Sequence, residues 1–496
     1  MHSSVEIDKT LAQAQRIPLA DDLHLVGVTA KYGAAAHFRR IVAFSEVIAD
    51  LFTVSLTVTL AYAIYVSVSP ATTSRYPVKT VLGIASAFAI VMSLMLDRAG
   101  AYRRGNSLLR VRETEQVLRV SVEAFLIALG ASFLSNLIFP RWLLVLCLLL
   151  VPLALFIEKT LMYLFIRMLH SRGYGVEKVL IYGSGHTGRR VFSVLKRSPK
   201  LGLNPVAFVD DDLTKAGNVV SELGYEHRRY APVVQGPVDR DLIARYEADL
   251  VIVAIPSLDP AKFVQTVDEA FGANARVSFV PSHLLPFDPW IDYQDVDGVL
   301  LASFGRATRR LGYEVLKRAS DLVVSLALLA IGSPLYLLLA SLIKLDSKGP
   351  IMFRQERVGQ NGKMFRMYKL RTMQTDAEPY SYSPISQTDH RITRIGRVLR
   401  RTSLDELPQL LNVLEGSMSL VGPRPEMPFI VKQYTESQRQ RLQVKPGITG
   451  LWQLSGDRAF LIHENIEYDL YYIRHRNFFM DLAILLHTSV FAMRGV

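Results

Sequence analysis

Four long apolar stretches in the first third of the chain constrain the fold more than any other feature, because each is near the length that crosses a bilayer. They cover residues 41–68, 78–96, 120–139 and 142–167. Basic residues lie before the first stretch, between the second and third, and after the fourth, whereas the other two connections carry little positive charge. By the positive-inside rule, both ends of the bundle lie in the cytoplasm. We predict a polar segment over residues 1–40 and a four-helix transmembrane bundle over residues 41–168.

Composition supports a membrane location. Half of the 496 residues are hydrophobic, and the formal net charge is +12. With apolar spans present, this charge suits the anionic cytoplasmic leaflet and phosphate substrates better than nucleic acid, so we expect no nucleic-acid partner. Cys147 is the only cysteine and lies in an apolar stretch, which excludes a disulfide framework and a cysteine-based metal site. The N-terminus shows no cleavable signal peptide.

Three carboxylates, Glu46, Asp50 and Glu123, fall within the predicted spans. An ion or lipid path is one interpretation of carboxylates inside a membrane. All three lie towards the cytoplasmic ends of their helices. We therefore prefer interfacial placement, or pairing with nearby arginines.

From residue 174 to residue 280 the pattern changes to that of a soluble α/β domain. Strands over 178–182 and 205–209 flank a glycine-rich turn and a helix, and the second strand ends at Asp210. This order is that of a dinucleotide-binding fingerprint, in which glycines admit a pyrophosphate and an acidic residue meets a ribose hydroxyl. The candidate nucleotide-binding residues are Gly183, Gly185, Gly188 and Asp210. No separate catalytic group is identifiable nearby, and nucleotide binding stays open.

Residues 281–312 are interpreted as a connector, and a fifth apolar stretch follows over residues 319–345. Gly332, Ser333 and Pro334 interrupt its centre, where proline removes a helical hydrogen bond and clashes one turn back. A kinked transmembrane helix is one interpretation. Basic residues flank the stretch on both sides, however, which places both ends in the cytoplasm. This favours a re-entrant membrane helix broken at Ser333 and Pro334.

An acidic pair, Asp405 and Glu406, stands among basic residues in the last third of the chain. Ser403 and Glu406 have the spacing of a capping box, which predicts that the pair lies at a helix N-terminus. Helix capping alone would explain such a pair. The basic surroundings favour instead a site where a metal ion and several phosphate oxygens meet. The basic residues concerned are Arg354, Arg357, Lys369, Arg371, Arg391, Arg394, Arg397, Arg400 and Arg424.

Four motifs in this region occur together in one known family. They are Lys369-Leu-Arg-Thr-Met373, Thr402-Ser-Leu-Asp-Glu-Leu-Pro-Gln-Leu410, Ser419-Leu-Val-Gly-Pro-Arg-Pro-Glu426 and Lys445-Pro-Gly-Ile-Thr-Gly-Leu-Trp-Gln453. From about residue 310 onwards the chain resembles the bacterial polyprenyl-phosphate hexose-1-phosphate transferases of the monotopic phosphoglycosyl transferase superfamily. The resemblance implies a catalytic domain over residues 313–496. It also implies the long form of these enzymes, with N-terminal membrane helices and a Rossmann-like domain whose role is regulatory or architectural.

The resemblance implies transfer of hexose-1-phosphate from a UDP-hexose to undecaprenyl phosphate, with release of UMP, at the cytoplasmic face of the bacterial inner membrane. Asp405 is then the nucleophile of a covalent aspartyl intermediate, and Glu406 is a ligand to Mg²⁺ or Mn²⁺. Arg400 and Arg424 take phosphate-binding positions. Weaker candidates for the same role are Lys369, Arg371, Arg354 and Arg357.

The pathway expected from the resemblance is exopolysaccharide, capsule or O-antigen synthesis, of which this transfer is the first membrane step. Glucose is the first expectation for the sugar and galactose the second. Expected partners are membrane lipids, downstream glycosyltransferases and a second copy of the chain. The sequence leaves the groups that recognise uridine unassigned; Asp457, His463, Asp469 and Asp481 receive no role.

Two other functions would use parts of this sequence. A membrane-anchored NAD-dependent nucleotide-sugar enzyme would use the turn from Gly183 to Gly188, but neither Tyr225 nor Tyr230 has a lysine four residues later. A non-catalytic scaffold for polysaccharide assembly would leave the acidic pair and the Pro-Arg-Pro cluster around Arg424 unexplained. The sequence therefore favours the transferase.

Overall fold

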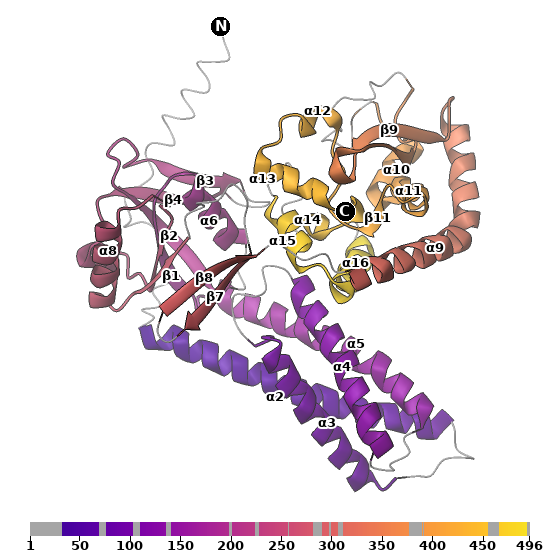
Figure 1. Cartoon of the computed structure of the whole chain (residues 1–496), viewed down its shortest axis with the longest axis horizontal. Helices are drawn as coiled ribbons and strands as arrows, with labels where there is room; N and C mark the ends of the chain where they lie inside the picture. The colour runs from indigo at the N-terminus through magenta and orange to yellow at the C-terminus, as the bar shows by residue number, and fades with distance from the viewer. Residues whose placement is uncertain are drawn as a thin grey trace. The chain divides into compact units, whose positions relative to one another are not determined.

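The computed structural model describes residues 32–68, 76–102, 110–134, 140–197, 201–223, 228–255, 257–280, 290–296, 299–305, 311–375, 389, 391–454 and 466–493. The chain divides into two compact units (Figure 1). The smaller unit consists mainly of residues 162–280, and the larger unit of residues 45–161 and 281–496. Most of the polar segment predicted over residues 1–40 lies outside the described part of the chain.

Four helices occupy the predicted spans. They are α2 (Tyr32–Val68), α3 (Val78–Arg98), α4 (Arg110–Leu134) and α5 (Arg141–Ser171). Within the described residues, these four and α9 (Leu311–Asp346) are long and apolar enough to cross a membrane. Large apolar side chains such as Phe52, Phe133 and Leu149 are more than half exposed, as a lipid-facing surface requires. The protein is therefore a membrane protein.

A buried charged group ties the bundle together. Asp50 of α2 is completely buried, and its carboxylate lies 2.7 Å from the Lys159 Nζ of α5. The Tyr102 hydroxyl donates to the same carboxylate at 2.6 Å. We expected pairing with an arginine; the partner is a lysine. Since a charge in an apolar bundle is stable only when it is paired, this contact accounts for Asp50 without an ion path.

Helix α4 begins ten residues before the predicted span, and this extension packs into the C-terminal part of the larger unit. Val111 is buried in the same apolar core as Val421 and Met480. The Thr114 hydroxyl lies 2.9 Å from the His487 ring on α16 (Phe478–Met493). The apolar pattern marked only the part of α4 from residue 120 onwards, because most residues of its first turns are polar.

The smaller unit contains a six-stranded sheet in the order β3-β4-β2-β1-β5-β6. The strands are β1 (Glu177–Tyr182), β2 (Leu203–Asp210), β3 (Val219–Leu223), β4 (Arg228–Gln235), β5 (Leu250–Val253) and β6 (Arg276–Phe279). Every pairing is parallel except that of β3 with β4. Helices α6 (His186–Arg197), α7 (Arg240–Arg245) and α8 (Pro260–Gly272) connect the strands. The predicted strands over 178–182 and 205–209 are confirmed as β1 and β2.

Within the predicted connector, β7 (Trp290–Val296) and β8 (Val299–Gly305) pair as an antiparallel hairpin. Helix α9 follows. The helical assignment of α9 is continuous through Pro334, so the predicted interruption is a bend rather than a gap, and Figure 1 shows the change of direction. Pro334 cannot donate to the carbonyl of Ala330 one turn back. The Ser333 hydroxyl takes that place and donates to Ala330 O at 2.9 Å.

Both ends of α9 are held by residues of the C-terminal part of the chain. Near its start, Lys317 Nζ lies 2.9 Å from the Asp481 carboxylate of α16, and Arg318 donates to two carbonyls at the end of α11 (Gln409–Glu415). At its end, Arg371 donates to Ser347 O at 2.7 Å. A straight helix of 36 residues would be about 54 Å long. The bend is what allows both ends to reach one compact unit.

The remaining C-terminal elements form a mainly α-helical domain. The strands are β9 (Met352–Val358), β10 (Met364–Leu370), β11 (Ser419–Val421) and β12 (Gly447–Thr449). The helices and 3-10 turns are η2 (Gln360–Gly362), α10 (Arg394–Thr402), η3 (Leu404–Glu406), α11 (Gln409–Glu415), α12 (Pro428–Val431), α13 (Glu436–Arg439), η4 (Gln440–Gln443), α14 (Leu451–Leu454), α15 (Glu467–His475) and α16. β9 and β10 form an antiparallel hairpin, and β11 pairs with β12 in parallel.

Candidate active site

The acidic pair lies in a tight turn between two helices. Ser403 ends α10 with a left-handed backbone, at φ 55°, and its side chain caps neither neighbouring element. The predicted capping box with Glu406 is therefore wrong. The left-handed residue reverses the chain so sharply that Asp405 and Glu406 fall in η3, and Pro408 precedes the first turn of α11. Sequence spacing could not reveal this, since Ser-x-x-Glu has the same spacing in both arrangements.

Three cations converge on this turn. Lys369, from β10, places its Nζ 2.7 Å from Glu406 Oε1 and 3.9 Å from Asp405 Oδ2. Arg424 places its Nη2 3.4 Å from the same Glu406 oxygen. Arg400, from the last turn of α10, is close enough to Asp405 for its positive charge to act against the rise in the Asp405 pKa. The structure thus brings together four of the predicted site residues, Asp405, Glu406, Lys369 and Arg424, with Arg400 beside them.

The two carboxylates are electrostatically different. Burial raises the pKa of Asp405, and although Lys369 opposes this effect, the net shift is upward. Burial acts in the same direction on Glu406, but there Lys369 and Arg424 outweigh it and lower the pKa to about 2. Glu406 is thus a fixed anion that two cations hold in place. Asp405 is a buried carboxylate whose charge is less fully compensated than that of Glu406.

The neighbouring arginines are oriented by the chain itself. Arg400 donates through Nε to the buried Thr372 hydroxyl at 3.0 Å, which leaves its two terminal nitrogens directed elsewhere. Burial lowers the pKa of Arg400 although Asp405 opposes this. Thr372 is accessible to α10 because Gly396 lies against its carbonyl; a Cβ on Gly396 would come within 2.1 Å of Thr372 O.

Three other predicted arginines occupy different positions. Arg357 donates to Pro425 O at 3.3 Å and to Gln355, and burial beside Arg424 lowers its pKa to about 10. Arg371 is buried against the end of α9, where its guanidinium meets the carbonyls of Ile343, Ser347 and Lys348. Arg354 lies over the Tyr368 ring, on the opposite face of β9 from Arg357. The structure does not bring Arg354 or Arg371 to the acidic pair.

The loop that carries Arg424 is held at four successive carbonyls. Pro423 O accepts from Gly447 N, and Glu426 O accepts from Val358 N. Between them, Arg424 O accepts from Arg441 Nη2 and Pro425 O from Arg357 Nη1. Close packing of glycines closes the base of this loop, since a Cβ on Gly447 would lie 2.1 Å from Gly422 N. The side chain of Arg424 is thus the part of the loop left to face the acidic pair.

Comparison with known proteins decides the family. A family described as bacterial sugar transferase matches residues 312–495, and one described as a CoA-binding domain matches residues 97–281. A UDP-glucose:undecaprenyl-phosphate glucose-1-phosphate transferase of Klebsiella pneumoniae is 32% identical over 330 residues, which are 64% of this chain and 68% of that protein. The chain belongs to the bacterial sugar transferases. It is therefore a sugar-phosphate transferase.

Two further relatives differ in the sugar that their names give. An undecaprenyl-phosphate galactose phosphotransferase of Salmonella typhimurium is 30% identical over 362 residues, covering 66% of this chain and 70% of that protein. An N-acetylgalactosamine phosphotransferase of Aeromonas hydrophila is 34% identical over 266 residues, covering 52% and 58%. Relatives whose names give different sugars are thus similar to this sugar transferase at comparable identity.

The acidic pair of the sugar transferase fits Mg²⁺. Both cation contacts of Glu406 go to Oε1, so Oε2 and the Asp405 carboxylate are the oxygens that a metal ion would meet. Within the described residues there is no cluster of three or more metal-ligating side chains. That is compatible with Mg²⁺, which is commonly bound by one or two carboxylates together with substrate phosphates.

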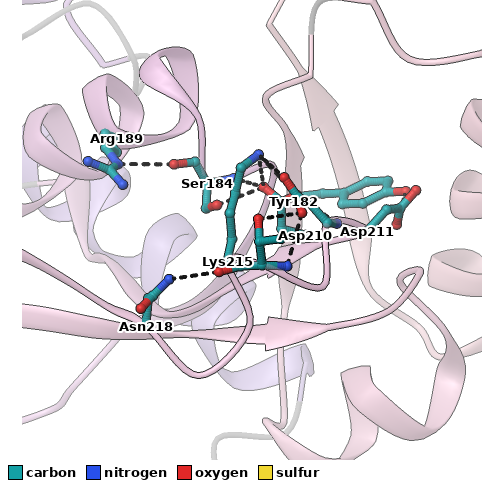
Figure 2. Close-up of polar contacts among 9 residues, drawn as sticks. Tyr182, Ser184, Arg189, Asp210, Asp211, Lys215 and Asn218 are labelled. Carbon is teal, nitrogen blue, oxygen red and sulfur yellow. Dashed lines mark hydrogen bonds and ion pairs between the residues drawn. The ribbon is translucent and has the colours of Figure 1, made fainter. Parts of the chain in front are cut away.

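The glycine-rich turn of the α/β unit forms a second polar cluster (Figure 2). Asp210 accepts from Ser184 N at 2.8 Å and from Ser184 Oγ at 2.7 Å, and Lys215 Nζ lies 3.4 Å from its carboxylate. These contacts lower the pKa of Asp210 although burial opposes them. The fingerprint directs Asp210 towards a ribose hydroxyl, but here its carboxylate points inward and is hydrogen-bonded to Ser184 of the glycine-rich turn.

The glycines of this turn are not equivalent. A Cβ on Gly188 would lie 1.8 Å from Gly183 O, and Gly183 itself has a φ of 108°. Chain packing therefore explains both. Gly185 has open space on its Cβ side.

The residues left without a role have structural positions where the structure describes them. Asp469 and Asp481 are buried in ion pairs with Arg441 and Lys317. Asp457 and His463 lie outside the described residues. Arg441 was missed at the sequence level, because its position between two motifs gives no signal of its own.

Proposed function

We propose that this enzyme transfers hexose-1-phosphate from a UDP-hexose to undecaprenyl phosphate and releases UMP. The names of its relatives support the two substrates. The observation that carries the mechanism is the buried Asp405 carboxylate beside the Lys369–Glu406–Arg424 ion group. A nucleophile, an anion and at least two cations gathered at one turn suit displacement at a phosphorus atom.

The reaction proceeds in two displacements. In the first, an Asp405 oxygen forms a bond to the phosphorus that carries the sugar, the phosphorus–oxygen bond to the uridylyl group breaks, and UMP leaves. In the second, a phosphate oxygen of undecaprenyl phosphate attacks the same phosphorus, and the bond to Asp405 breaks. Asp405 returns to its free form, and the sugar leaves on a lipid diphosphate.

The covalent intermediate on Asp405 avoids the direct approach of the two anionic substrates, the UDP-hexose and undecaprenyl phosphate. Lys369 and Arg424 neutralise Glu406, and Arg400 and Arg424 offer guanidinium groups to the phosphate oxygens. Bound at Glu406, Mg²⁺ would stabilise charge on the leaving phosphate. Mn²⁺ is the second choice of metal. Arg357 supports this arrangement indirectly, through the carbonyl of Pro425.

The proposed location is the cytoplasmic face of the bacterial inner membrane. We propose that α9 enters the membrane and returns to the same side, with its bend at Ser333 and Pro334. Support comes from the anchoring of both ends on one domain and from the exposed apolar side chains between them, such as Ile331, Leu337 and Leu338. Such a helix keeps Asp405 at the surface where a lipid phosphate lies.

Glucose is the proposed sugar and galactose the alternative. The transfer would begin exopolysaccharide, capsule or O-antigen synthesis and hand its product to glycosyltransferases. For the α/β unit, the inward-turned Asp210 favours a regulatory or architectural role over dinucleotide binding. We propose no hydride chemistry there. A homodimer is the proposed assembly.

The test is UMP release by the full chain in nanodiscs containing undecaprenyl phosphate, with Mg²⁺ and a panel of UDP-sugars. We expect release with one or two sugars, none from Asp405→Asn, and loss on addition of EDTA. Asp469→Asn is unsuitable as a control because that carboxylate is buried; Asp241→Asn, on the surface of the α/β unit, should leave the rate unchanged. Release from Asp405→Asn at the native rate would contradict the mechanism.

A further inference from the structure

Arg441 of η4 lies beneath the loop that carries Arg424. Its side chain is almost completely buried, at 3% exposure, and all three branches of its guanidinium are used. Nε donates to Asp469 Oδ2 at 2.7 Å, Nη1 to the Tyr434 hydroxyl at 2.6 Å, and Nη2 to Arg424 O at 3.2 Å. The Glu426 carboxylate lies 4.0 Å away. One buried cation therefore joins α15, the segment between α12 and α13, and the Pro-Arg-Pro loop.

The ion pair alone does not explain this arrangement. Asp469, itself 2% exposed, already balances the charge of Arg441. A lysine would serve for that purpose. Only a guanidinium has a rigid fork that holds the carboxylate with one nitrogen and a main-chain carbonyl with another. The geometry is that of a support for the loop rather than of a simple charge pair.

The carbonyl of Arg424 is the part of the loop that most needs support. Pro423 and Pro425 fix their own φ angles, and Pro425 also restricts the backbone of the residue before it. The direction of the Arg424 carbonyl follows ψ of Arg424. Holding that carbonyl therefore fixes ψ of Arg424, one of the two backbone rotations that set the direction of the Arg424 side chain towards Glu406.

We propose that Arg441 is a positioning residue for sugar-phosphate transfer, which acts by holding Arg424 in the orientation that meets the donor diphosphate. The inference rests on the proposed function for the identity of that diphosphate. The contact between Arg441 and the loop is observed in the structure and is independent of the proposed function. The two parts therefore need separate readouts.

The first readout is amide hydrogen exchange of the loop from Gly422 to Met427 in the full chain in nanodiscs. Arg441→Lys keeps a charge for Asp469 but loses the fork, and Tyr434→Phe removes one hydroxyl partner. We expect faster exchange in the loop for both variants, larger for Arg441→Lys. The matched control is Arg439→Lys, two residues away on the exposed side of α13. It should leave exchange unchanged.

The second readout is the rate of UMP release. We expect Arg441→Lys to lower kcat/KM roughly 10- to 100-fold, the effect of losing one hydrogen bond from a charged group in the transition state. In an Arg424→Lys background the same change should have little further effect, because the group it positions is already altered. A merely structural role would lower both backgrounds by the same factor.

The outcomes separate the two proposals. Unchanged exchange of the loop in Arg441→Lys, in protein that retains its melting temperature, overturns the positioning role whatever the activity. Equal losses of rate in the native and Arg424→Lys backgrounds overturn it as well. Altered exchange together with no UMP release by the native protein on any donor would refute the proposed function and leave the loop contact intact.

Discussion

Substitution of Lys369 by Met should destabilise the enzyme through Glu406. The Glu406 side chain is 19% exposed, and its pKa lies at about 2 instead of 4.5. A difference of this size corresponds to about 3 kcal/mol in favour of the charged form. Lys369 is nearer to Glu406 than Arg424 is, so its removal should take away the larger part, roughly 2 kcal/mol.

The sign and pH range follow from the direction of the shift. A carboxyl whose pKa is lowered by folding stabilises the fold at every pH above its unfolded pKa, here 4.5, and loses that contribution only as the pH falls through its folded pKa. The deficit of Lys369→Met should therefore be constant between about pH 6 and pH 8. For a domain of this size it corresponds to a fall in melting temperature of roughly 4–8 °C.

The assay is thermal unfolding of the full chain in detergent with EDTA, so that no metal ion replaces the lost cation. Lys363→Met, an exposed lysine on the β9–β10 hairpin, is the matched control and should change little. Adding Glu406→Gln to Lys369→Met should restore most of the stability, because the unpaired carboxylate is then gone. A double variant no more stable than Lys369→Met would refute this electrostatic account of the site.

Three further predictions follow from the same contacts. UMP formation should slow as the pH falls through the raised pKa of Asp405, because the charged carboxylate is the nucleophile; in Lys369→Met a pH–rate profile should show this acid limb moved to higher pH. Gly447→Ala should abolish folding or activity by forcing Gly422 away. Gly312→Ala, with open space at its Cβ, should match the native protein in melting temperature and UMP release. Val111→Ala, in the part of α4 buried in the C-terminal core, should lower the free energy of unfolding by roughly 1–3 kcal/mol, and equal stability to Val145→Ala on the exposed side of α5 would show that α4 does not dock there.

The apolar spans and the first two strands of the α/β unit were predictable because each is a local run of apolar residues. The site was predictable only as a set of residues. The acidic pair, Lys369 and Arg424 belong to recognisable motifs, and the structure brings them together. Arg354 and Arg371 belong to the same basic region but point elsewhere. Arg354 lies on the face of β9 opposite to Arg357, and Arg371 contacts the end of α9. Which face of β9 meets the site, and where α9 ends in space, depend on tertiary packing.

Three features had no reliable signal in the sequence. The left-handed Ser403 contradicts the capping box, since residue spacing does not report φ. Asp210 lies where the fingerprint places it, yet its carboxylate accepts a hydrogen bond from the Ser184 hydroxyl. Arg441 lies between motifs and contacts Arg424 only through a main-chain carbonyl, for which any residue type would serve as acceptor.

The most direct test of the central claim is to mix the enzyme with its UDP-sugar and Mg²⁺ in the absence of undecaprenyl phosphate. The account predicts a burst of UMP equal to the amount of enzyme, and a hexose-phosphate adduct on the peptide that contains Asp405, detected by mass spectrometry. Addition of undecaprenyl phosphate should then remove the adduct. Steady turnover with the lipid acceptor, but neither burst nor adduct without it, would mean direct transfer between the two substrates and would contradict the role assigned to Asp405.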